Sequence, residues 1–173
     1  EGIDFDTLSE KVARTGNYKC WLPTITSKIR AKESFLVEEW KYNQKLTTKH
    51  LKITIPGPMT ITDTIANTFY KSDEEMGEDL ADAINIEIKR LVDVGCKYIQ
   101  VDEPLFARKP ENALNFGIKN LERCFRDIVD DSVEKITHIC CGYPDKLDAI
   151  DYPKAPLDSY SKISKELDNS IID

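Results

Sequence analysis

The sequence predicts an α/β fold, a partial (β/α)8 TIM barrel in which parallel strands alternate with helices. Three observations predict it. Short apolar runs alternate with longer segments of helical periodicity through most of the chain, as they do in parallel α/β sheets. Polar motifs follow three of these runs, and barrels carry their chemistry at the carboxyl ends of their strands. Gly57 stands alone between two prolines, so the glycine fingerprint of a doubly wound dinucleotide fold is absent.

The first third of the chain is predicted to hold two strands with a helix between them. Residues 18–22 are expected to form a strand and residues 35–47 a helix. Apolar side chains alternate in residues 51–55, which is typical of a strand. The Pro-Gly-Pro sequence at 56–58 ends that strand, because proline has no N–H group to donate within a ladder or a helix interior.

A long amphipathic helix and another strand follow. Ser72, with a glutamate three residues later, has the spacing of a capping box. Apolar residues then recur on one stripe from Met76 to Leu91, and Gly95 is a suitable C-terminal stop. Residues 97–101 are expected to form a strand, and the sequence Asp-Glu-Pro follows it directly.

The alternation continues to the end of the chain. Pro110 is expected to begin a second amphipathic helix, residues 136–140 a further strand, residues 159–167 a helix and residues 170–172 the start of a strand. A whole barrel takes about 250 residues. The 173 residues, 1–173, are therefore expected to form a single domain that is a truncated middle portion of a barrel. Its open sheet edges make homo-oligomer formation an expectation.

Composition and charge limit the partners. A net charge of −7 and a pI near 5.0 disfavour nucleic acid and anionic membranes, because both bind a cationic face. No apolar stretch approaches the roughly 20 residues that span a bilayer, and the first residues lack the pattern of a secretory signal. We expect a cytoplasmic protein with a small-molecule substrate. The five cysteines form no regular framework and are expected to be reduced.

The strongest functional motif is the His-Ile-Cys sequence at the end of the strand predicted at 136–140. Side chains alternate across a strand, so His138 and Cys140 are predicted to leave the same face. Imidazole and thiolate are zinc ligands, and most protein zinc sites have four ligands. We interpret the two residues as metal ligands that need partners from elsewhere. The alternative is a buried histidine beside a core thiol, but their place at a strand end favours the metal.

The Asp-Glu pair after the preceding strand is predicted to divide between two faces. Asp102 and Glu103 are adjacent and point apart, so they are not a pair for acid and base catalysis. We expect Asp102 to face the substrate and to bind an ammonium group, and Glu103 to form a hydrogen bond or a salt bridge in the wall. The alternative for Asp102 is that it caps a following helical turn. No residue is assigned as a catalytic acid, base or nucleophile.

Taken together, these motifs make the chain resemble the C-terminal catalytic barrel of cobalamin-independent methionine synthase, a 5-methyltetrahydropteroyltriglutamate–homocysteine methyltransferase. The resemblance extends from about residue 45 to residue 142. Three segments carry it, in this order: Ile-Pro-Gly-Pro-Met-Thr at 55–60, Gly-Cys-Lys-Tyr-Ile-Gln-Val-Asp-Glu-Pro at 95–104, and Thr-His-Ile-Cys at 137–140. Gln-x-Asp-Glu-Pro and His-x-Cys are the specific motifs among them.

The resemblance implies a methyltransferase of methionine biosynthesis. In that family zinc holds homocysteine as a thiolate, which attacks the methyl group of the donor. His138 and Cys140 resemble the first two zinc ligands, and Asp102 resembles the carboxylate that holds the amino group of homocysteine or methionine. The family's remaining ligands, a glutamate and a second cysteine, are expected beyond Asp173, so the zinc site is expected to be incomplete in this chain.

Two departures from the family concern the methyl donor. Thr64 stands where the family has a tryptophan that contacts the folate, and Arg108 stands where it has a folate-binding glutamate. The donor and the acceptor thiol are therefore left open, and zinc-dependent alkyl transfer to another thiol such as coenzyme M is an alternative. A catalytically inert α/β module that pairs through its sheet edges is a second alternative. A decarboxylase of the uroporphyrinogen type is a weaker third.

Overall fold

A parallel three-stranded sheet is the centre of the computed structural model. Its strands are β3 (Lys52–Pro56), β5 (Tyr98–Asp102) and β6 (Glu134–His138), in the order β3-β5-β6. Each was predicted, with bounds shifted by one or two residues, and the parallel arrangement confirms the predicted fold class. The structure describes residues 1–13, 18–142, 148, 151–152 and 154–173.

Helices connect these strands, as the alternation predicts. Those found in the described residues are α1 (Val37–Gln44), α2 (Pro58–Thr64), α3 (Asp73–Asp93), α4 (Pro110–Asn112), the π-helical segment η1 (Ala113–Gly117), α5 (Ile118–Cys124) and α6 (Asp158–Asp168). The helix predicted from Pro110 therefore forms with a π-helical interruption. None of these helices combines the length and the apolar character that crossing a membrane requires.

The long helix α3 begins and ends where its sequence predicts. The hydroxyl of Ser72 accepts a hydrogen bond from the Glu75 N–H group at 3.2 Å. In a capping box the Glu75 carboxylate would accept a hydrogen bond from the N–H group of Ser72. Here it accepts from the N–H group of the preceding residue, Lys71. Gly95, with φ +97°, follows the last turn in the left-handed conformation that favours glycine.

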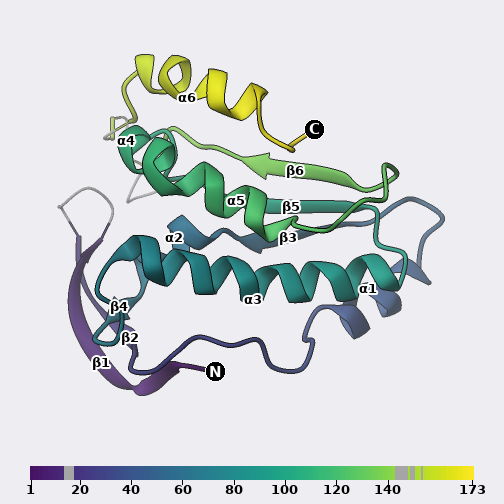
Figure 1. Ribbon diagram of the computed structural model, residues 1–173, viewed down its shortest axis with the longest axis horizontal. Helices are drawn as coiled ribbons and strands as arrows, with labels where there is room; N and C mark the ends of the chain where they lie inside the picture. The colour runs from purple at the N-terminus through teal and green to yellow at the C-terminus, as the bar shows by residue number, and fades with distance from the viewer. Residues whose placement is uncertain (14–17, 143–147, 149–150, 153) are drawn as a thin grey trace.

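The two faces of the parallel sheet have different surroundings. Ile99 and Val101 are fully buried and belong to the same core as residues of α3 and α5, which lie side by side in front of the sheet in Figure 1. The opposite face of the same strands carries polar side chains that are exposed or half-buried, among them Lys52, Gln100 and His138. The sheet is therefore covered by helices on one face, and the other face is accessible.

The amino-terminal strand prediction needs a correction. Residues 18–22 are indeed extended, but they lie in β2 (Tyr18–Ile25), which pairs antiparallel with β1 (Ile3–Ala13). β2 also pairs with β4 (Ala66–Asn67), so these strands form a second sheet, separate from the parallel one. Figure 1 shows this hairpin curving at the side of the molecule toward which β6 points.

The strand β1 was not predicted because its alternation is broken. The pairing register with β2 shifts between Asp4 and Leu8, and the Asp4 carboxylate accepts hydrogen bonds from the N–H groups of Asp6 and Thr7 within that interval. A bulge of this kind moves the side chains that follow it to the other face. The apolar pattern of β1 therefore does not have the period of two by which a strand is identified.

The carboxyl-terminal residues approach β6 without forming the predicted strand. Residues 170–172 have no strand assignment. The N–H group of Asp173 donates to the carbonyl of Lys135 at 2.9 Å, and the N–H group of Lys135 donates to the Asp173 carboxylate at 2.8 Å. The end of the chain thus occupies part of the outer edge of β6 with its backbone and one side chain.

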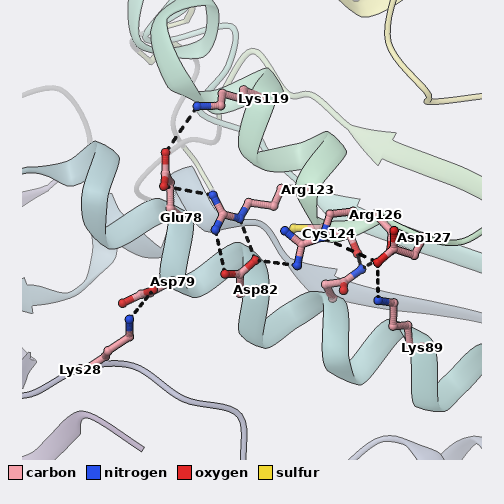
Figure 2. Close-up of polar contacts among 11 residues, drawn as sticks. Lys28, Glu78, Asp79, Asp82, Lys89, Lys119, Arg123, Cys124, Arg126 and Asp127 are labelled. Atoms are coloured by element: carbon pink, nitrogen blue, oxygen red, sulfur yellow. Dashed lines mark hydrogen bonds and ion pairs between the residues drawn. The ribbon is translucent and has the colours of Figure 1, made fainter.

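A network of ion pairs joins α3 to the α5 region on the outer surface of the helix layer (Figure 2). The guanidinium of Arg123 donates to both carboxylate oxygens of Asp82, at 2.7 and 2.8 Å, and its third nitrogen lies 3.0 Å from Glu78. Arg126 lies 3.3 Å from the same Asp82 carboxylate. The hydrogen bonds from Arg123 are the main cause that lowers the pKa of Asp82 below its usual value. The two helices are therefore held by charge as well as by apolar packing.

Replacement of Asp82 by Asn is expected to lower the free energy of unfolding by about 1 kcal/mol at pH 7, a modest value because the pair is partly screened by water. A carboxylate whose pKa is lowered in the folded state stabilises above the unfolded pKa, near 3.8, and loses that effect as the pH falls. The difference between wild type and Asp82→Asn should therefore shrink below about pH 4. Urea denaturation at several pH values measures it.

The control is Asp127→Asn, which removes a carboxylate from an exposed pair with Lys89. It should change the stability far less than Asp82→Asn. Equal effects of the two substitutions would contradict the special role of the Arg123 pair.

Candidate functional site

The carboxyl ends of the three parallel strands form one row. Pro56 of β3 lies opposite Asp102 of β5, and Asp102 lies opposite His138 of β6. The hydrogen bonds continue past the strands, because the N–H group of Gly57 donates to the Asp102 carbonyl at 2.8 Å and the N–H group of Glu103 donates to the His138 carbonyl at 2.9 Å. The backbone at this edge is fixed on both sides of β5.

Asp102 and His138 are neighbours on the accessible face of the sheet. Residues opposite each other in a parallel pair project to the same face. The amide of Gln100 donates to an oxygen of Asp102 at 2.6 Å, and the Lys52 ammonium donates to the Gln100 carbonyl oxygen at 2.5 Å. This chain of hydrogen bonds holds the Asp102 carboxylate in one orientation. The structure thus brings together two of the three residues that the sequence singled out.

Cys140 lies beyond the strand in which it was predicted. β6 ends at His138, and the sulfur of Cys140 accepts a hydrogen bond from the N–H group of Gly142 at 3.2 Å. The alternation that placed Cys140 on the face of His138 therefore does not extend to it. Within the described part of the chain, no group of three or more His, Cys, Asp or Glu side chains is arranged to hold a metal ion. The ligand roles of His138 and Cys140 stay predictions.

Glu103 fixes the helix that borders the site. Its side chain is fully buried, and its carboxylate accepts hydrogen bonds from the N–H groups of Met59 and Thr60, both at 2.9 Å, and from the Thr60 hydroxyl at 2.8 Å. These N–H groups belong to the first turn of α2, where an intrahelical partner is lacking. The residue before that turn, Gly57, has no side chain to cap it. Glu103, which directly follows β5, therefore caps the first turn of α2.

The glycine before α2 is required by this arrangement. A Cβ atom at Gly57 would lie 2.3 Å from the carboxyl carbon of Glu103, closer than two such atoms can approach. The sequence had indicated a hydrogen-bonding role for Glu103 in the wall, which the structure confirms. The sequence had not shown that the partners are Met59 and Thr60, 44 and 43 residues earlier. The available signal was a helix that starts without Ser, Thr, Asp or Asn at its N-cap.

Burial dominates the titration of Glu103. The loss of water around its carboxylate raises the pKa of Glu103 to about 7, although the hydrogen bonds from Thr60 and Met59 act in the opposite direction. A carboxyl group with this pKa is partly protonated near neutral pH. Because its side chain is enclosed, Glu103 is a structural element of the site.

A small pocket of about 100 Å³ opens at the same end of the sheet. It is bounded by α2, by the loop after β5 and by the segment after β6, and it is lined by Thr60, Asp63, Thr64, Pro104, Leu105, Arg108, Cys140 and Gly142. Thr64 and Arg108, the two positions expected to differ from the family that the sequence resembles, both belong to this lining. The pocket was not predicted, because its residues come from three separate segments of the chain.

Two lysines fix the walls of this pocket. Lys109, next to Arg108, forms an ion pair with Asp63 of α2 and so ties the loop after β5 to that helix. Lys11 of β1 donates to the carbonyls of Thr62 and Ile65, at 2.5 and 2.9 Å, at the carboxyl end of α2. A cation at that end is favoured by the unpaired carbonyls and by the helix dipole. The hairpin is therefore anchored beside the candidate site.

Comparison with known proteins places these features in one family. The family model described as "Cobalamin-independent synthase, Catalytic domain" matches residues 1–155. The chain is similar to a methionine synthase of Sulfolobus acidocaldarius, with 33% identity over 166 residues that cover 87% of this chain and 48% of that protein. A methionine synthase of Saccharolobus solfataricus is 36% identical over 121 residues, which cover 69% of this chain and 35% of that protein.

Solved structures show the same relationship. A B12-independent methionine synthase from Shewanella sp. W3-18-1, in complex with selenomethionine, is similar with a TM-score of 0.85 and 31% identity, over 99% of this chain and 50% of that one. A putative vitamin-B12 independent methionine synthase from Listeria monocytogenes has the same fold at 21% identity, with a TM-score of 0.60 over 68% of this chain and 41% of that one. The chain spans about half the length of the relatives it matches, or less. The similarity confirms the predicted fold class, part of an α/β barrel.

We expect the stability of the protein to fall as the pH rises from about 4.5 to 7. A carboxyl group whose pKa is raised in the folded state, as for Glu103, stabilises fully below its unfolded pKa of 4.5 and loses that effect as the pH rises through about 7. Glu103→Gln should remove this slope, and it should lower stability at pH 5 because an amide cannot accept all three hydrogen bonds. Chemical denaturation of both proteins between pH 4.5 and 8 measures the effect. An unchanged slope in Glu103→Gln would contradict the assignment.

Proposed function

This chain belongs to the cobalamin-independent methionine synthase family, and on that premise we propose that the protein transfers a methyl group to the thiolate of homocysteine, held by zinc, to give methionine. The observation that carries the proposal is the row of strand ends in which Asp102 lies opposite His138 on the accessible face of the sheet. A carboxylate for an ammonium group and an imidazole for a metal stand side by side there. Such a pair suits an amino acid whose thiol side chain is held by a metal.

Asp102 is proposed to bind the amino group of homocysteine. Its carboxylate is half-buried and is held by Gln100, so it is oriented before the substrate arrives. A hydrogen bond between an ammonium group and a carboxylate is charge-assisted and stronger than a neutral one. With the amino group fixed at Asp102, the short side chain of the substrate extends toward the neighbouring strand end, where His138 lies.

His138 and Cys140 are proposed to hold the zinc ion together with ligands from outside the described residues. Imidazole and thiolate are the donor types that zinc takes in proteins, so the two residues present fit the metal as far as they go. When bound, zinc lowers the pKa of a coordinated thiol and keeps a thiolate available at neutral pH. The described residues supply no third donor beside them.

The remaining residues around the strand ends are proposed to position the substrates. Glu103 holds the first turn of α2 against β5, and the pocket beside Cys140 lies between α2 and the loop after β5. A methyl donor bound in that pocket would approach the thiolate from the side of Cys140.

Zinc binding tests the metal part of the proposal. His138→Ala and Cys140→Ser should each lower the zinc content of the purified full-length protein, and methyl transfer to homocysteine should fall by at least about 100-fold, since even the loss of an outer-shell partner costs up to that much. Cys141→Ser is the matched control, because Cys141 is a neighbouring thiol with no predicted ligand role. Elemental analysis and a homocysteine methylation assay measure the two quantities.

The metal assignment fails if both variants retain the zinc content of the wild type. It also fails if Cys141→Ser lowers the zinc content as much as Cys140→Ser does.

A second test addresses the role of Asp102. Asp102→Asn removes the charge that faces the ammonium group, and the loss of one charge-assisted hydrogen bond is expected to raise the KM for homocysteine by about 10- to 100-fold. The kcat should change much less, because the contact is made equally in the ground state and in the transition state. Glu134→Gln is the control, since Glu134 lies on the same face at the opposite end of β6. A KM unchanged in Asp102→Asn would contradict the assignment.

A further inference from the structure

A cationic side chain lines the pocket beside Cys140. Arg108 lines the pocket and is half-buried. Within the described part of the chain its guanidinium has no hydrogen bond and no ion pair. A guanidinium in a partly desolvated position normally finds an acceptor, because it carries five N–H donors and stays charged at every physiological pH. A ligand bound in the pocket can supply the hydrogen-bond acceptor for the Arg108 guanidinium.

The acidic groups near the pocket are engaged elsewhere. Asp63, which also lines the pocket, forms an ion pair with Lys109. Glu103 lies behind the pocket wall and accepts its hydrogen bonds from Met59 and Thr60. Within the described residues, neither carboxylate forms an ion pair with Arg108. The positive charge of Arg108 is therefore the uncompensated charge in the described lining.

The rest of the pocket limits the size and polarity of the ligand. Pro104 and Leu105 contribute apolar surface to the lining, to which Cys140 also belongs. A volume of about 100 Å³ is well below the roughly 300 Å³ at which complete small-molecule sites begin. The pocket therefore has room for the charged end of a ligand, and the body of the ligand must lie outside, toward the strand ends.

We propose that Arg108 binds an oxyanion, a carboxylate or a phosphate group, at the end of the second substrate, and that this substrate lies against Pro104 and Leu105 and extends past Cys140. The planar fork of the guanidinium matches either group in a bidentate manner. The proposal rests on the proposed function only in naming the ligand as the second substrate. Binding of the anion itself is tested without metal and without turnover, so the two proposals can fail separately.

The rate at which the Cys140 thiol is alkylated depends on the charge in this pocket, because Cys140 belongs to its lining. Iodoacetate and iodoacetamide are of similar size and alkylate the same thiols, but only the first carries a carboxylate. In protein freed of metal by a chelator, the ratio of the alkylation rates of Cys140 by the two reagents reports whether the pocket attracts an anion. Peptide mapping by mass spectrometry separates Cys140 from Cys141, which does not line the pocket and is the internal reference.

Arg108→Met should lower that rate ratio at Cys140 by about 3- to 10-fold, as expected for the loss of one nearby charge at a high effective dielectric constant. The ratio at Cys141 should change much less. Arg108→Lys retains the charge and should keep most of the ratio, which separates an electrostatic effect from a folding defect. Lys119→Met on α5 removes a distant exposed charge and should leave the ratio at Cys140 unchanged. A ratio in Arg108→Met equal to that of the wild type would overturn the proposal, as would equal changes at the two cysteines.

Protection experiments separate the two kinds of oxyanion. Benzoate and phenyl phosphate carry the same ring, and each is added at matched ionic strength during alkylation of Cys140 by iodoacetamide. Slower alkylation with one of them in the wild type, and not in Arg108→Met, supports the proposal and identifies the group as carboxylate or phosphate. Protection by neither compound, or protection that persists in Arg108→Met, would overturn it.

Discussion

The buried carboxylate of Glu103 ties strand β5 to the first turn of α2, and the geometry of the candidate site depends on that tie. A helix that begins with Gly57 and Pro58 has no side chain of its own to satisfy its first N–H groups. Glu103, at the end of the adjacent strand β5, accepts hydrogen bonds from two of these N–H groups. The approach is possible because Gly57 has no Cβ atom. The direction in which α2 leaves the sheet is thereby fixed, and α2 forms one wall of the pocket beside Cys140.

The adjacent residues Asp102 and Glu103 illustrate how one strand serves two environments. Successive side chains point to opposite faces, so Glu103 enters the buried side with Ile99 and Val101, while Asp102 remains on the accessible side with Gln100. Burial raises the pKa of Glu103, which suits a structural role under the helices. Asp102 keeps access to a ligand, and the hydrogen bond from Gln100 restricts its motion. The structural carboxylate and the carboxylate proposed to bind the substrate are thus adjacent in the sequence.

The pocket combines segments that are distant in the chain. Asp63 of α2 pairs with Lys109 of the loop after β5, and Lys11 of the hairpin caps the other end of the same helix. Each contact spans more than 40 residues. The hairpin therefore contributes to the candidate site although none of its residues was singled out as functional. Arg108 projects from the loop that these contacts hold in place, which is why its charge is presented to the pocket.

The sequence by itself determined the parallel strands, the capped helix that begins after Ser72, and the division of Asp102 and Glu103 between two faces, because period, caps and alternation act over a few residues. Only the tertiary structure decided the rest. It revealed the bulged strand β1, the cap that Glu103 provides to α2, and the position of Cys140 beyond the end of β6. The cap arises from a contact between distant segments, whose partner no local pattern indicates. The bulge in β1 and the end of β6 at His138 depend on local hydrogen bonds of Asp4 and Cys140 that interrupt the alternation. A side chain's residue type indicates which chemistry it can perform, and the packing of distant elements decides what it meets.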